Sequence, residues 1–275
     1  MLIGYYLSNG KYGLDFRHVK NYAPILRTTV REYMTSETSE EQGFALFKEG
    51  LREANPKWIV LGLDWRGWAE KHTFPGDIAF EAIEIVRSLG MWNRVLTVEI
   101  DDEPGWDTET ATAIFELYKA ALRNTKSQPP QYGAGIVEHG RGILDTNGWR
   151  VFDWVGLEGY VDPPGDWDPK RNRQRLNATM REQYAKLDRK PFLWVMQGYD
   201  RNGAWKNEYT LAALQADSFS LMRSKPFKDT ILPFSLIFAH SRPGGTKDNP
   251  VLGEVHRAYV YGTRTRMDVQ GEDET

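Results

Sequence analysis

Acidic side chains gather at the end of one apolar run near the middle of the chain. The segment reads Leu96-Thr97-Val98-Glu99-Ile100-Asp101-Asp102-Glu103-Pro104. Side chains of an extended strand alternate between its two faces. One face is therefore expected to carry Thr97, Glu99, Asp101 and Glu103, and the other Leu96, Val98 and Ile100.

Three carboxylates on one face have a chemical consequence. They repel one another, which raises the pKa of at least one of them and keeps a proton available near neutral pH. An isolated acid at a strand end would more simply cap the next helix or bind an arginine. A row of three favours a functional site, with Glu103 as the general acid and with Glu99 and Asp101 tuning it.

Other polar residues close further apolar runs. Carboxylates at three of these ends, Asp64, Glu138 and Glu158, are reserve candidates for an assisting group. His139 and His240 also follow such runs, and a metal site could join them with Glu158 and Glu99. No His-x-His or His-Glu-x-x-His spacing is present, so hydrogen bonding is the better interpretation and no metal or other cofactor is expected.

These residues depend on strands that bring them to one place. Eight apolar, β-rich runs are found at about 2–7, 25–30, 58–64, 94–101, 132–138, 152–160, 191–197 and 231–239. Most are followed by apolar residues at helical spacing, such as Ala111, Ile114, Phe115, Tyr118 and Leu122 after the fourth run. The first and fifth connections show little helical pattern.

Alternation of strand and helix predicts parallel strands joined by right-handed crossovers, and eight units close naturally into a (β/α)8 TIM barrel. An open doubly wound sheet is the alternative, but no glycine-rich phosphate fingerprint follows the first run. We expect a single barrel domain over 1–263 and a frayed acidic tail over 264–275.

Composition excludes several classes of protein. The formal charge of the 275 residues is −3 and is spread along the chain, so nucleic-acid binding is not expected. No cysteine is present to supply thiolate chemistry or disulfides. No apolar window is long enough to cross a membrane. We expect a soluble monomer or weak oligomer, cytoplasmic unless a secretion signal has been removed.

The chain is rich in aromatic residues, with 10 Trp and 13 Tyr. Aromatic rings pack in protein cores, and they also stack on the faces of sugars. Five tryptophans near strand ends are candidate sugar platforms: Trp65, Trp68, Trp106, Trp194 and Trp205.

The acidic run also carries a resemblance to known enzymes. Asp102-Glu103-Pro104 at the end of a fourth strand resembles the Asn-Glu-Pro signature of clan A glycoside hydrolases, and Glu99-x-Asp101-x-Glu103 is similar to the Asp-x-Asp-x-Glu pattern of family 18 chitinases. Both resemblances imply that Glu103 donates a proton to a glycosidic oxygen. They also imply that Tyr160 lies beside the reacting sugar. We further expect Gln197 and His240, at the ends of the seventh and eighth runs, to contact this sugar of an oligosaccharide or polysaccharide.

The chain departs from clan A at the end of the seventh run, which reads Phe192-Leu193-Trp194-Val195-Met196-Gln197 where that clan has a nucleophilic Glu. Gln197 has three interpretations: an inactivating Glu→Gln change, a native residue that orients an acetamido group or a water, or lost catalysis with sugar binding kept. The alternatives to a glycosidase are accordingly a catalytically silent sugar-binding barrel and a metal-dependent sugar isomerase or epimerase.

Overall fold

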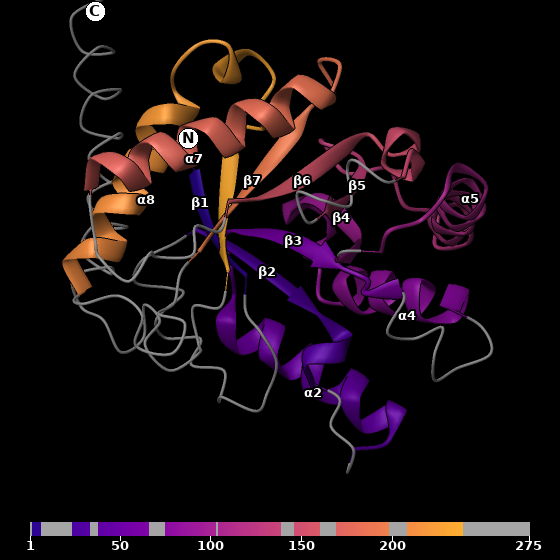
Figure 1. The fold of residues 1–275 in the computed structure, drawn as a ribbon. Helices are drawn as coiled ribbons and strands as arrows, with labels where there is room; N and C mark the ends of the chain where they lie inside the picture. The colour runs from indigo at the N-terminus through magenta and orange to yellow at the C-terminus, as the bar shows by residue number, and fades with distance from the viewer. Residues whose placement is uncertain are drawn as a thin grey trace, which may run out of the picture.

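Eight parallel strands pair in chain order and close into a barrel, with the last strand returning to the first (Figure 1). The structure is a computed structural model, and it describes residues 2–6, 24–33, 38–65, 75–102, 104–138, 146–159, 169–197 and 208–238. The predicted (β/α)8 TIM barrel is confirmed, and the open doubly wound sheet is excluded. The strands are β1 (Leu2–Tyr6), β2 (Ile25–Thr29), β3 (Trp58–Gly62), β4 (Val95–Asp102), β5 (Ala134–Glu138), β6 (Trp154–Gly159), β7 (Phe192–Gln197) and β8 (Phe234–Phe238).

Helices lie outside the barrel and connect successive strands (Figure 1). The α-helices are α2 (Glu40–Ala54), α4 (Pro75–Ser88), α5 (Thr108–Asn124), α7 (Pro169–Lys186) and α8 (Glu208–Met222). Short 3-10 helices are η2 (Val30–Tyr33), η3 (Trp92–Arg94), η4 (Gly148–Val151) and η5 (Phe227–Asp229). The segment that follows the eighth predicted run and the predicted tail over 264–275 lie outside the described residues.

Two helix starts show how local sequence sets the boundaries. Ser39 and Gln42 form a reciprocal capping box at the start of α2, in which Gln42 N donates to Ser39 Oγ at 3.2 Å and Ser39 N to Gln42 Oε1 at 2.9 Å. Asp107 caps α5 by accepting a 2.8 Å hydrogen bond from Thr110 N. Both helices therefore begin where the sequence satisfies otherwise unpaired backbone donors.

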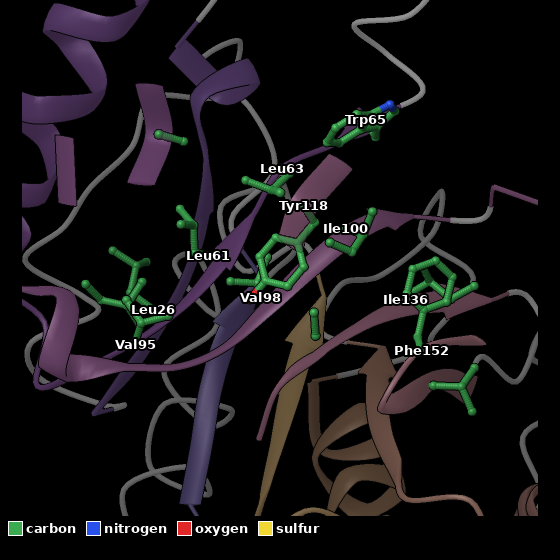
Figure 2. Packing of buried hydrophobic residues seen from close by; sticks show 14 of the residues in the cluster. Leu26, Leu61, Leu63, Trp65, Val95, Val98, Ile100, Tyr118, Ile136 and Phe152 are labelled. Atoms are coloured by element: carbon green, nitrogen blue, oxygen red, sulfur yellow. The ribbon is translucent and has the colours of Figure 1, made fainter. Parts of the chain in front are cut away.

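The apolar residues form two cores. The outer core lies between strands and helices, and Figure 2 shows part of it, including Leu26, Leu61, Val98 and Ile100. The inner core comes from the strands and the segment before β8, and fills the barrel. Its buried members are Ile25, Val60, Leu96, Val137, Trp154, Leu193, Val195, Leu232, Phe234 and Leu236.

Trp154 shows how the barrel interior is filled. Its Nε1 donates to Thr97 Oγ1 of β4 at 2.6 Å, over the inner face of β5. Its ring also covers Gly135, where a Cβ atom would lie only 2.2 Å from the indole. The missing side chain of Gly135 therefore makes room for the indole, and Thr97 faces the interior as the sequence predicts.

Leu96 corrects one detail of the predicted alternation. It was expected on the helix side of β4 but belongs to the inner core. The register between β3 and β4 shifts at this point, since Ile59 pairs with Val95 and Val60 with Thr97. Leu96 is the extra residue of this irregularity, so two successive side chains, Leu96 and Thr97, turn inward.

None of the helices in the described ranges combines the length and the apolarity needed to span a membrane.

Candidate active site

The acidic end of β4 lies largely inside the barrel structure. Glu99 is fully buried and Asp101 nearly so, while Asp102 is partly exposed. Glu103, the leading catalytic candidate, follows directly on β4 but lies outside the described residues. The structure therefore places the residues that precede Glu103 at the carboxyl end of the barrel, where βα-barrel enzymes have their active sites.

A buried arginine, Arg27 of β2, compensates Glu99. The guanidinium forms an ion pair with Glu99 through Nη2 and Oε1, and its Nε donates to Glu99 Oε2 at 3.3 Å. Its Nη1 donates to Glu32 Oε1, in η2, at 2.9 Å. One guanidinium thus links two carboxyl groups that are separated by 67 positions in the sequence, and Arg27, Glu32 and Glu99 form a buried charge cluster.

Gly62 of β3 makes this cluster possible. β3 lies between β2 and β4 in the barrel, so Arg27 must pass the inner face of β3 to reach Glu99. A Cβ atom at Gly62 would lie 3.0 Å from both Cζ and Nη2 of Arg27, and 2.7 Å from Cγ2 of Thr29. The absence of a side chain at Gly62 therefore provides the space that the guanidinium occupies.

Burial also changes the charge state of Glu32. Desolvation raises the pKa of Glu32 from 4.5 to about 8, although the positive charge of Arg27 and hydrogen bonds from Thr28 and Thr29 act in the opposite direction. The side chain of Thr28 donates to Glu32 Oε2 at 3.2 Å. At neutral pH the cluster therefore holds a proton on Glu32, and the charge of Arg27 is balanced by Glu99.

The alternation of β4 is interrupted a second time at its end. Glu99 pairs with Gly135, but the next paired residues are Asp102 and Val137, so three steps along β4 match two along β5. The backbone N–H of Asp102 donates to Oδ1 of Asp101 at 2.8 Å. Asp102, rather than Asp101, is thus in register with an inner-core residue. The predicted alternation from Glu99 to Asp101 therefore does not hold through this shift, because a bulge reverses the facing of the residues that follow it.

The two reserve acids on β5 and β6 lie on different faces. Glu158 is 7% exposed and is in register with Val195 of the inner core, so it belongs to the inner face. Glu138 is buried and in register with Leu157 of the outer core. The register therefore groups Glu158, and not Glu138, with Glu99.

Beyond the buried cluster along the strands lie the exposed Arg31 and the partly buried Asp64. Arg31 of η2 and Asp64 each lie two positions beyond the paired residues Thr29 and Gly62. Nη1 of Arg31 donates to both carboxylate oxygens of Asp64 at 2.9 Å. The Arg31–Asp64 pair thus lies at the carboxyl ends of β2 and β3, on the side of the barrel where β4 ends.

The aromatic candidates are less favourable as sugar platforms than the sequence suggests. Trp194 is fully buried in the outer core, so its predicted role as a platform is wrong: it faces the helices because β7 turns Leu193 and Val195 into the barrel. Trp65 is 4% exposed and belongs to the same core (Figure 2). Trp106 is partly buried and packs against Phe152, with ring centroids 6.3 Å apart.

Several predicted site residues cannot be placed by the structure. Those outside the described residues are Trp68, Glu103, His139, Tyr160, Trp205 and His240. Gln197 ends β7, but nothing is described of its side chain. In the part of the chain that the structure covers, no three His, Cys, Asp or Glu side chains are grouped in a way that could hold a metal ion.

Sequence reasoning missed the two arginines and Glu32. A signal for Arg27 was present, because it is a charged residue inside the apolar run Ile25-Leu26-Arg27-Thr28-Thr29. A charge in a buried strand must find a partner, since isolated burial is costly. The identity of that partner depended on the fold, because Glu99 lies 72 positions away.

The structure defines a closed βα barrel in which Asp102, Glu138 and Glu158 lie at or near the carboxyl ends of β4, β5 and β6. Comparison with solved structures gives a β-glucuronidase from an uncultured Clostridium species, with a TM-score of 0.57 and 14% identity over 95% of this chain and 50% of that one. Ruminococcus gnavus β-glucuronidase in complex with D-glucaro 1,5-lactone gives a TM-score of 0.54 and 13% identity, over 89% of this chain and 46% of that one. The same enzyme in complex with uronic deoxynojirimycin gives a TM-score of 0.55 and 15% identity, over 89% of this chain and 45% of that one.

These likenesses establish the fold. The chain spans about half the length of the solved structures it matches. No protein-family model and no curated protein matches the sequence.

Proposed function

We propose that the chain is a glycoside hydrolase that acts on an oligosaccharide or polysaccharide, with Glu103 as the general acid. Glu103 would protonate the leaving glycosidic oxygen as the bond to the anomeric carbon breaks. The observation that carries the proposal is the acidic end of β4, which brings Glu99, Asp101 and Asp102 to the carboxyl end of a closed barrel directly before Glu103. The glycosidase fold of the structural neighbours supports it.

The local charges suit a proton donor at this position. Arg27 forms an ion pair with Glu99 and a hydrogen bond with Glu32, so its charge is already balanced below the strand end. Asp101 and Asp102 immediately precede Glu103 and add negative potential there. Negative neighbours stabilise the protonated form of a carboxyl group, which is the form that a general acid requires.

The group that assists Glu103 is the second part of the proposal. We assign this role to Glu158, a carboxyl group that lies on the inner face of β6. Gln197 at the end of β7 would instead orient a water or an acetamido group of the substrate. Carboxyl groups about 5–5.5 Å apart would predict retention of anomeric configuration, and about 6.5–9.5 Å apart inversion.

The test is turnover of the Glu103→Gln variant. A substrate is first identified with a panel of 4-nitrophenyl glycosides and natural polysaccharides. The panel includes glucuronides because the structural neighbours are β-glucuronidases. The variant should then lose about 10²–10⁴-fold in kcat, while its melting temperature stays within about 2 °C of the parent. The matched control is Glu116→Gln on the exposed face of α5, which should leave turnover unchanged. Parent-like kcat in Glu103→Gln would refute the assignment.

Gln197→Glu separates the three interpretations of Gln197. If Gln197 replaces a nucleophile, the nearly isosteric change should create or raise retaining hydrolysis. Lower activity than the parent would make Gln197 a native part of the site. Sugar binding without turnover in either form would instead favour a catalytically silent sugar-binding barrel.

A further inference from the structure

Arg31 is held in place from several sides. It is the one exposed residue of η2, whose other residues Val30, Glu32 and Tyr33 are buried. Its backbone N–H donates to Thr29 Oγ1 at 2.9 Å. The next residue, Glu32, is bound to Arg27 and Thr28 below. The backbone of Arg31 is therefore anchored by buried contacts, although its side chain is half exposed.

The guanidinium of Arg31 has a free edge. Both hydrogen bonds to Asp64 use Nη1, and Nε and Nη2 have no hydrogen-bond partner among the described residues. The side chains are 51% exposed for Arg31 and 15% for Asp64. The pair consequently presents unused N–H donors beside a carboxylate whose oxygens have further lone pairs.

The backbone of Asp64, which supplies the carboxylate of this pair, has a positive φ. Its φ is +50°, in the left-handed region that residues other than glycine rarely enter. Such conformations are found preferentially where a side chain must be held for a function. This observation is independent of the exposure of Arg31, and both concern the same pair.

The charges around the pair disfavour an anionic ligand. Arg31 and Asp64 neutralise each other, and Arg27 is shared by two carboxyl groups. The Arg31–Asp64 pair therefore offers an anion no net attraction, whereas neutral hydroxyl groups can use both its N–H donors and its carboxylate oxygens.

We propose that Arg31 and Asp64 form a subsite for two adjacent hydroxyl groups of an uncharged sugar. One hydroxyl oxygen accepts from Nε or Nη2 of Arg31, and the neighbouring hydroxyl donates to the carboxylate of Asp64. The planar guanidinium suits such paired contacts, because its donors have a fixed direction. The inference rests on the proposed glycosidase function and gives its substrate class: a neutral glycan.

The experiment compares Arg31→Gln and Asp64→Asn with the parent. The substrates are 4-nitrophenyl glycosides in matched pairs that differ only at C6, such as the glucoside and the glucuronide, and neutral tetrasaccharides of glucose, xylose and mannose. Each variant should raise KM for the neutral substrate about tenfold and leave kcat within about twofold, because the contact is the same in ground and transition states. Arg31→Lys should recover only part of the loss, because a lysine lacks the planar fork.

Two controls separate binding from folding and from charge. Arg87→Gln removes another exposed, ion-paired arginine, on α4, and should leave KM unchanged. Melting temperatures check that each variant is folded. The KM for the neutral substrate should also be insensitive to salt, whereas an anion held by Arg31 would bind more weakly as salt rises.

The outcomes distinguish the subsite from the proposed function. If both variants hydrolyse the neutral substrate with the KM of the parent, the subsite is refuted and the glycosidase proposal stands. The same conclusion follows if the parent prefers the glucuronide and its KM for the glucuronide depends on salt. Without hydrolysis, calorimetric Kd values for the neutral tetrasaccharides provide the test. Weaker binding by Arg31→Gln would then support the subsite and refute the hydrolase. Neither binding nor hydrolysis of any sugar would overturn both.

Discussion

Stability should fall as pH rises through the range in which Glu32 titrates, and Glu32→Gln should remove that loss. Glu32 is buried beside Arg27, and burial raises its pKa from 4.5 to about 8. Between these two values the folded protein keeps a proton that the unfolded chain releases. Folding is therefore favoured most below pH 4.5, and the contribution is lost as pH rises to about 8.

The magnitude follows from the two pKa values. Each pH unit between them changes the free energy of unfolding by about 1.4 kcal/mol, so the whole interval is worth on the order of 5 kcal/mol. Glutamine cannot titrate, and its amide can keep the hydrogen bond that Glu32 Oε1 accepts from Arg27 Nη1 at 2.9 Å. The variant should thus match the parent near pH 4.5 and exceed its stability by several kcal/mol near pH 8.

Urea unfolding at a series of pH values measures the difference in free energy of unfolding between Glu32→Gln and the parent. Equal m-values show that both proteins unfold in the same way. Subtracting the two curves removes the titration of all other groups. Glu49→Gln, an exposed acid on α2, is the matched control and should run parallel to the parent. If the free energies of unfolding of the parent and of Glu32→Gln also change in parallel from pH 4.5 to about 8, Glu32 does not hold the proton assigned to it.

The other stability predictions concern the same cluster. Arg27→Met should lower the free energy of unfolding by about 3–5 kcal/mol, because it leaves Glu99 buried without its cation, and adding Glu99→Met should restore a large part of the loss. A single-variant loss below about 1 kcal/mol in urea unfolding would contradict this account. Gly62→Ala should lower the free energy of unfolding by about 1–3 kcal/mol, because the new methyl group would crowd the Arg27 guanidinium and Thr29. A urea unfolding midpoint equal to that of the parent would show that the guanidinium can move aside.

The barrel could be predicted from the sequence because its signals are local. Each strand is a short apolar run, and most are followed by apolar residues at helical spacing. Caps such as Ser39 and Asp107 mark where helices begin. Eight alternating units then leave few ways to bury every strand on both faces. These features do not depend on distant contacts, so the sequence by itself was sufficient for the fold class.

The facing of individual side chains was less predictable. Strict alternation along β4 failed twice, at Leu96 and again between Glu99 and Asp102, because the register depends on the neighbouring strands β3 and β5. Trp194 illustrates a related limit. Its position near a strand end suggested a ligand contact, but the pleat of β7 turns it toward the helices.

The site could be predicted only in part, for the same reason. The sequence by itself determined which acids lie at the end of β4, since Glu99, Asp101, Asp102 and Glu103 are consecutive or nearly so. Only the tertiary structure decided that Arg27 neutralises Glu99, that Glu32 shares the same guanidinium and that Gly62 leaves the space for it. An ion pair across 72 residues depends on closure of the barrel, which brings β2, β3 and β4 side by side and buries their charges together.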